Sequence, residues 1–183
     1  LGMPEYGRER LAAVVVESRA EQTYPWLWTL WQAIRRYLDG DVSGAYAQIS
    51  GVQIPPIVST GQEGIFTALV VPTISVAAGK PEEALALIEE LLANMEASGL
   101  IGLRGNAHRS RGDALAALGR TAEALAAYRL SLAEARRLGV RRTEWGALMA
   151  LVELEPEPAA AADYRAQASE VISFLADHLE EPD

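Results

Sequence analysis

His108 and His178 are the only histidines in this 183-residue sequence, and cysteine is absent. Nucleophilic catalysis needs a base within hydrogen-bonding reach of the nucleophile, and neither histidine lies in a recognisable motif. The sequence contains no GxSxG, GxxxxGK[ST], GxGxxG or HExxH pattern, so the usual signatures of acyl transfer, nucleotide hydrolysis, dinucleotide chemistry and zinc hydrolysis are missing. We therefore expect no catalytic residues and no enzyme. We expect His178 to interact with the carbonyl end of a helix and His108 to be solvated on a polar helix face.

Metal and cofactor sites are not expected either. Without cysteine there is no thiolate zinc site, iron–sulfur cluster or disulfide framework, and two histidines cannot make a zinc finger. Glu153, Glu155 and Glu157 alternate with Leu154 and prolines in a turn between helices, and they lack the glycine and ligand spacing of an EF-hand. We interpret them as a solvated loop.

The charge of the chain argues against two classes of partner. There are 25 acidic and 16 basic side chains, a formal net charge of −9, which opposes general attraction to nucleic acid or to anionic lipid. The longest apolar stretches, such as Ile65–Ala78, are interrupted and shorter than the ~20 residues that span a bilayer. The N-terminal residues do not resemble a secretion signal. These features predict a cytoplasmic protein that binds neither nucleic acid nor membrane.

Apolar residues recur at intervals of three and four, which predicts helices rather than strands. The clearest segments are Pro81–Ser98, with Pro81 suited to a first helical position, and Thr121–Leu138, followed by Gly139. A third helix is predicted from Ala159 to Leu179. The expected fold class is all-α.

An internal repeat organises these helices. Gly40, Gly79 and Gly119 are 39 and 40 residues apart. Each is followed five positions later by an alanine and nine positions later by a large residue, the pairs being Ala45 and Ile49, Ala84 and Ile88, and Ala124 and Tyr128. A turn glycine followed by a close-packing alanine is typical of a helix pair, and a period near 40 predicts an α-solenoid.

The run from Gly112 to Tyr128 resembles a tetratricopeptide repeat (TPR). The small, large, turn, alanine and aromatic positions of that family fall at Gly112, Leu115, Gly119, Ala124 and Tyr128. The stretch from Ala135 to Leu179 is similar to the TPR C-terminal regions of large bacterial multidomain signalling proteins. Those proteins join an ATP-hydrolysing module to a nucleotide cyclase, a kinase or the DNA-binding domain of a transcriptional activator.

The resemblance implies a right-handed α-solenoid of antiparallel helix pairs forming a single domain over residues 1–183. The helix pairs would span 25–51, 63–98, 100–138 and 141–180, preceded by an orphan helix over 5–22 from a repeat whose first helix is missing. The chain would then be a piece of a longer bacterial signalling protein.

The same register implies a concave groove lined by the first helix of each pair. It would bind a peptide or protein segment, including one from another domain of the parent polypeptide. Arg109 and Arg142 would hold carboxylates, and Tyr37, Phe66 and Trp145 would be apolar anchors. The full predicted set of groove residues is Tyr37, Phe66, Leu69, Asn106, Arg109, Asp113, Arg142, Trp145 and Met149. The predicted function is a non-catalytic protein–protein interaction and regulatory module.

Two other classes of function stay open. Similar repeats in some bacterial activators bind a small-molecule inducer, and exposed terminal helices could instead make a structural homodimer. Trp26, Trp28 and Trp31 cannot all fill one core on a helix, so at least one should be exposed or lie at an interface.

The segment from Arg104 to Arg142 contains nine arginines against three acidic residues, a local charge of +6. This basic segment could receive an acidic partner. The alternative is that the arginine stems cover apolar helix surface, and that Arg136, Arg137, Arg141 and Arg142 flank a helix end where cations are favoured.

Overall fold

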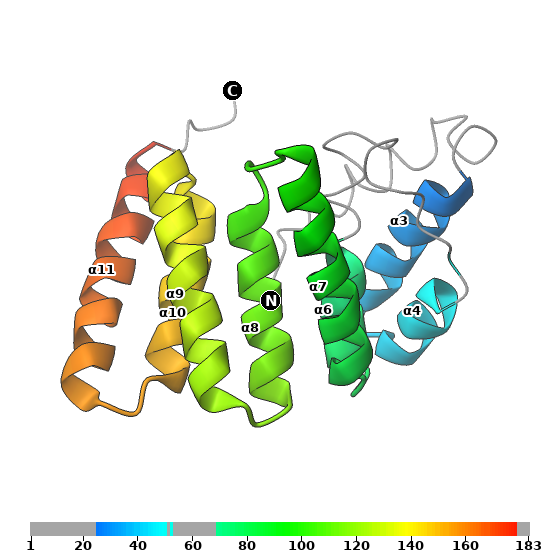
Figure 1. Ribbon diagram of the computed structural model, residues 1–183, viewed down its shortest axis with the longest axis horizontal. Helices are drawn as coiled ribbons and strands as arrows, with labels where there is room; N and C mark the ends of the chain where they lie inside the picture. Colours follow the sequence, from blue (N-terminus) through cyan, green and yellow to red (C-terminus); the bar gives the residue numbers. More distant parts are fainter. Residues whose placement is uncertain (1–24, 51, 53–68, 179–183) are drawn as a thin grey trace. The chain divides into compact units, whose positions relative to one another are not determined.

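The computed structural model describes residues 25–50, 52 and 69–178. These ranges contain helices and no strand, so the all-α class is confirmed (Figure 1). The orphan helix predicted over 5–22, and the part of the second pair before residue 69, lie outside the described residues. The helices are α3 (Pro25–Leu38), α4 (Val42–Ile49), α6 (Val70–Ala77), α7 (Pro81–Ser98), α8 (Arg104–Ala117), α9 (Thr121–Leu138), α10 (Arg141–Leu154) and α11 (Pro158–Asp177).

The chain divides into two compact units, Leu1–Lys80 and Pro81–Asp183. The first contains α3, α4 and α6, and the second contains α7 to α11. A single right-handed superhelix through both units stays a prediction.

The helix ends follow the local signals in the sequence. α7 begins at Pro81 and carries Glu82 and Glu83 in its first turn. Their negative charges interact favourably with the positive end of the helix dipole. α9 ends at Leu138, and the left-handed backbone of Gly139 (φ 69°) lets the Val140 N–H donate to the carbonyl of Ala135 (2.9 Å). The turn glycines of the repeat, Gly40, Gly79 and Gly119, also have positive φ, as the repeat pattern predicts. The helix predicted from Ala159 to Leu179 is shifted slightly, since α11 begins at Pro158 and ends at Asp177. The third pair, predicted from residue 100, begins with α8 at Arg104.

The first unit packs its helices through the repeat positions. Ala45 and Ile49 of α4 are buried, as are Leu30 and Ala33 of α3. The tryptophans of α3, namely Trp26, Trp28 and Trp31, are each half-buried, so none of them is a fully enclosed core residue.

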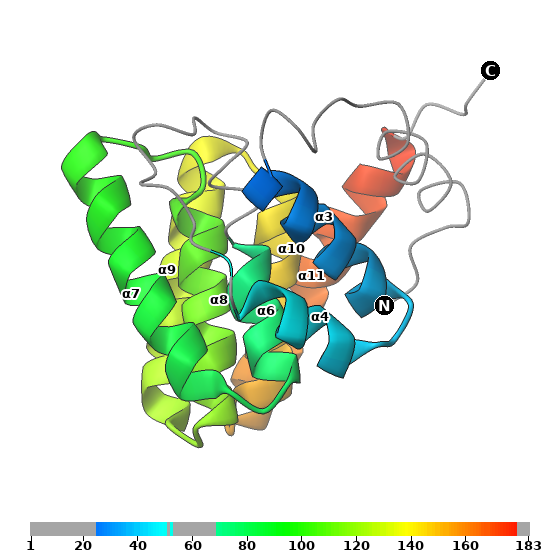
Figure 2. The ribbon, with the colours of Figure 1, turned by 90° about the vertical axis from the view of Figure 1, so that its right-hand side faces the viewer.

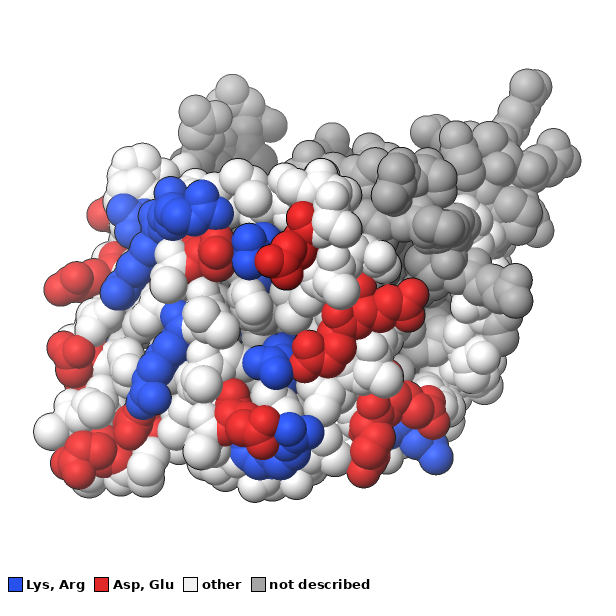
Figure 3. All heavy atoms as spheres, in the orientation of Figure 1, with Lys and Arg blue, Asp and Glu red and all other residues white. Residues whose placement is uncertain are grey.

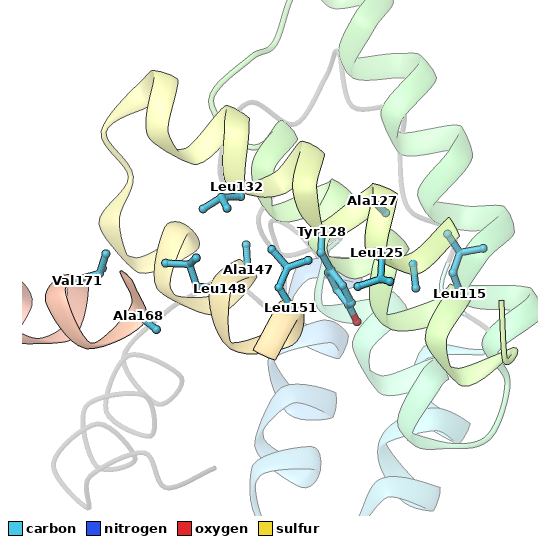
Figure 4. Close-up of a cluster of buried hydrophobic side chains, with 11 residues drawn as sticks. Leu115, Leu125, Ala127, Tyr128, Leu132, Ala147, Leu148, Leu151, Ala168 and Val171 are labelled. Atoms are coloured by element: carbon cyan, nitrogen blue, oxygen red, sulfur yellow. The ribbon is translucent and has the colours of Figure 1, made fainter. Parts of the chain in front are cut away.

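The second unit is a stack of helices in which each element packs on its neighbours in sequence. Figure 1 shows α8 between α7 on one side and α9 with α10 on the other, and Figure 2 shows the same helices turned by 90°. A continuous core runs through α8, α9, α10 and α11 (Figure 4). It consists of Leu115, Ala124, Leu125, Ala127, Tyr128, Leu132, Ala147, Leu148, Leu151, Ala168 and Val171.

Gly112 and Tyr128 explain why the repeat needs a small residue opposite an aromatic one. The ring of Tyr128, on α9, lies against the backbone of Gly112 on α8, and a Cβ at Gly112 would overlap the ring. Tyr128 is 4% exposed and has little room to move. The close approach of α8 and α9 therefore depends on the missing side chain.

Gly112→Ala should destabilise the second unit. Overpacking a core costs about 1–3 kcal/mol, and the better helix propensity of alanine returns about 1 kcal/mol, so we expect a net loss of about 1 kcal/mol in urea unfolding. Gly102→Ala is the matched control, because a Cβ there meets no atom within 4 Å. An unchanged urea midpoint for Gly112→Ala would mean that the Tyr128 ring does not set the helix spacing.

Candidate functional site

Six of the predicted groove residues lie on α8 and α10 in the second unit, and we call this surface the α8–α10 face. Spacings of three and seven residues place them along one side of each helix. Asn106, Arg109 and Asp113 come from α8, and Arg142, Trp145 and Met149 come from α10.

Two contacts join the helices at this face. The Thr143 hydroxyl donates a hydrogen bond to the Asn106 side-chain oxygen (2.8 Å). The side chain of Arg109 passes over Gly146, where an added Cβ would lie 3.4 Å from Arg109 Cδ. Asn106 and Arg109 therefore lie on the side of α8 that contacts α10.

The structure does not place the three other predicted groove residues on this face. Tyr37 is half-buried on α3 and Leu69 is buried just before α6, both in the first unit. Phe66 lies outside the described residues. A groove that includes these residues stays a prediction.

Arg109 is not a free cation. Its Nη1 lies 3.2 Å from Asp113 Oδ2, and the Tyr128 hydroxyl donates to Asp113 Oδ1 (2.9 Å). Burial raises the pKa of Asp113, and Arg109 and the Tyr128 hydrogen bond oppose that rise only in part. Burial and the Asp113 charge also raise the pKa of Tyr128, which keeps the phenol protonated as a donor. This part of the face is polar but internally neutralised.

Arg142 and Trp145 are the two residues of the face that are exposed rather than half-buried. Arg142 is exposed and makes no ion pair with any residue in the described ranges, and the Trp145 side chain is 36% exposed. They are three residues apart on α10 and therefore neighbours on the helix surface. Met149 is half-buried against the core and contributes an apolar edge.

Most arginines of the basic segment form ion pairs within the second unit. Seven of its nine arginines lie within 4.0 Å of an acidic side chain. Basic and acidic side chains accordingly lie next to one another in Figure 3. The charge of +6 read along the sequence therefore overstates what the segment can offer to an acidic partner. The pairs are Arg109–Asp113, Arg111–Glu89, Arg120–Glu123, Arg129–Glu155, Arg136–Glu144, Arg137–Glu134 and Arg141–Glu144.

Glu144 is a buried carboxylate that sequence reasoning missed. Its side chain is 5% exposed, and its oxygens accept hydrogen bonds from Arg136 Nε (2.9 Å) and Arg141 Nη1 (2.8 Å). Burial alone would raise the pKa of Glu144, but the two arginines outweigh it and lower the pKa. The interpretation of Arg136 and Arg141 as helix-end cations is thus incomplete, because both hold this carboxylate.

The two histidines behave differently from one another. The Nδ1 atom of His178 lies 2.7 Å from the carbonyl oxygen of Phe174, so its predicted position at a helix end is confirmed. The prediction of a solvated His108 is wrong. His108 is half-buried, its Nδ1 has no hydrogen-bond partner in the described residues, and burial together with Arg104 and Arg111 lowers its pKa.

Two searches restricted to the described residues were negative. No group of three or more potential metal-ligating side chains comes together there. No helix in those ranges combines the length and apolar character needed to cross a bilayer.

The described residues form an all-helical, TPR-like fold. No protein-family model and no curated protein matches the sequence. The fold is similar to that of PlcR from Bacillus thuringiensis, solved in complex with the peptide PapR7 and DNA, with a TM-score of 0.64 and 16% sequence identity. The match covers 93% of this chain but only 66% of the PlcR chain. At this identity the likeness supports the TPR-like fold and does not by itself carry a function.

Proposed function

We propose that this chain is a non-catalytic regulatory module that binds a peptide or a segment of a partner protein on the α8–α10 face. The observation that carries the proposal is the exposed Arg142, which has no ion partner among the described residues and lies about one helical turn from the exposed Trp145. A protein segment with a carboxylate near an apolar side chain would satisfy both groups at once.

The chemistry of the face favours such a ligand. A guanidinium forms charge-assisted hydrogen bonds with carboxylates, and tryptophan and arginine are enriched among residues that dominate binding energy. The Thr143 bond uses the oxygen of the Asn106 amide, and the amide N–H groups have no partner in the described residues, so they can donate to a ligand carbonyl. The Arg109–Asp113 pair beside them adds polarity without net charge.

The similarity to PlcR is consistent with a peptide ligand, since PlcR was solved with the peptide PapR7. That structure also contains DNA, but this chain spans only 66% of the PlcR chain and carries a net charge of −9. We therefore propose a peptide rather than DNA for this segment. A parent protein of the bacterial multidomain signalling type, acting in the cytoplasm, is part of the same proposal.

A phage-displayed library of random peptides tests the proposal. Peptides selected on the unmodified chain should share an acidic residue close to an aromatic or large aliphatic one. Their affinity should fall at least about tenfold for the Arg142→Gln, Trp145→Ala double variant, a loss of about 1.4 kcal/mol. Arg142 is exposed, but Trp145 is only 36% exposed, so the melting temperature should fall somewhat and binding is compared at a temperature where both proteins are folded.

The control changes an arginine and a large apolar residue elsewhere on the unit. Arg120→Gln with Leu130→Ala alters an exposed, paired arginine and a 48% exposed leucine outside the α8–α10 face. This control should bind the selected peptides normally. Peptides that bind the Arg142→Gln, Trp145→Ala variant as tightly as the unmodified chain would refute the assignment of this face.

A further inference from the structure

A second candidate site, apart from the α8–α10 face, lies where α9, α10 and α11 meet. It is an open pocket of about 260 Å³, lined by Arg136 of α9, Arg141 and Glu144 of α10, and Gln167, Glu170, Val171 and Phe174 of α11. Pockets for drug-sized ligands measure about 300–1,000 Å³. The size therefore suits a smaller molecule.

One side of the pocket is formed by two guanidinium groups that a buried carboxylate holds in place. Glu144 is buried and accepts one hydrogen bond from each of Arg136 and Arg141, which fixes the position of both arginines. Each guanidinium has five N–H groups. Among the described residues only two of those of Arg136 and one of those of Arg141 are used, so donors remain on both for an incoming carboxylate.

The other side comes from α11 and combines a negative charge with an apolar wall. Glu170 is exposed and forms no ion pair with any residue that the structure describes. Val171 and Phe174 line the pocket beside it. The Phe174 ring is 43% exposed and is held by Arg141, 5.2 Å from the ring centroid, and by stacking on His178.

The charges of the pocket cancel, but they are separated. Two arginines face two glutamates, one of which, Glu144, is already neutralised by its hydrogen bonds. A simple anion would be repelled by Glu170, and a simple cation by the arginines. A ligand with no net charge but with both a carboxylate and an ammonium group fits this arrangement.

We propose that this pocket binds a free α-amino acid with an apolar side chain. The α-carboxylate accepts hydrogen bonds from Arg136 and Arg141, the α-ammonium group pairs with Glu170, and the side chain lies against Val171 and Phe174. The interior of a peptide chain has neither charged group. This site is therefore independent of the peptide site proposed above.

Calorimetric titration of the whole chain with L-leucine and L-phenylalanine tests the site directly. The free amino acids should bind, and N-acetyl-L-leucine and L-leucinamide should each bind at least about tenfold more weakly, because each lacks one of the two charges. N-acetyl-L-leucine binding as tightly as L-leucine would show a site for any carboxylate and would overturn the proposal. Failure of both free amino acids to bind would also overturn it.

Glu170→Gln separates a real ammonium contact from a general effect of charge. Because Glu170 is exposed and has no ion partner in the described residues, the variant should fold normally. Its affinity for L-leucine should fall about tenfold. Its weak affinity for N-acetyl-L-leucine should rise, because the repulsion between Glu170 and that anion is removed. The matched control is Glu90→Gln on α7, an exposed glutamate outside the pocket, which should bind L-leucine normally. Equal losses in the two variants would contradict the contact.

Discussion

Ala124→Trp is expected to disrupt packing in the second unit and to lower its urea midpoint sharply. Ala124 lies on α9, five residues after the turn glycine Gly119, and its side chain is completely buried. It belongs to the core that links α8 to α11, where a large side chain has no space. Overpacking of this kind costs about 1–3 kcal/mol and occasionally more, and tryptophan in place of alanine is an extreme case.

Ala126→Trp is the control for this prediction. Ala126 is exposed on the same helix, so the new indole can extend into solvent, and the urea midpoint should stay close to that of the unmodified chain. If Ala124→Trp unfolds at the same urea concentration as Ala126→Trp, the repeat alanine does not set the distance between neighbouring helices.

The second large effect is expected from removing both arginines that hold Glu144. In the Arg136→Gln, Arg141→Gln variant a buried carboxylate loses two charged donors. Breaking a buried ion pair costs about 3–5 kcal/mol. We expect a loss near 3 kcal/mol, the lower end, because both arginine side chains are about half exposed and water can reach them.

Adding Glu144→Gln to that double variant should recover most of the loss, because no charge is then buried without a partner. Arg137→Gln removes the exposed arginine of the Arg137–Glu134 ion pair. This change should cost less than about 1 kcal/mol. A double variant that unfolds no earlier than Arg137→Gln would contradict the structural role of Glu144.

The pH dependence of unfolding gives an independent measure of the same interaction. The pKa of Glu144 is lower in the folded chain than its ordinary value of 4.5. Its stabilising effect is therefore complete above that value and is lost as the pH falls through the folded pKa. The unmodified chain should lose more stability on acidification than the variant in which Arg136, Arg141 and Glu144 are all glutamine. Parallel pH profiles would contradict this.

The sequence by itself determined the helices and their turns. The spans of α7 and α9 were predicted from their end residues, because proline at a first helical position and glycine in the left-handed region act within one turn of the chain. The close approach of Gly112 and Tyr128 could also be anticipated from the repeat pattern, because the two residues lie on neighbouring helices that one short turn connects. The groove residues assigned to α8 and α10 came from the register of the repeat that the sequence resembles, and the groove itself stays a prediction.

The tertiary structure decided which charges remain available. Long arginine side chains reach partners far away in sequence, as in Arg129–Glu155 and Arg111–Glu89, and no local pattern specifies such a pair. Burial also depends on which helices pack against a residue. Spacing alone therefore could not show that Glu144 is buried or that His108 is half-buried. From the sequence, the nine arginines between Arg104 and Arg142 could receive an acidic partner or cover helix surface. In the structure seven of them lie in ion pairs, and Arg142, three residues from Trp145, is exposed.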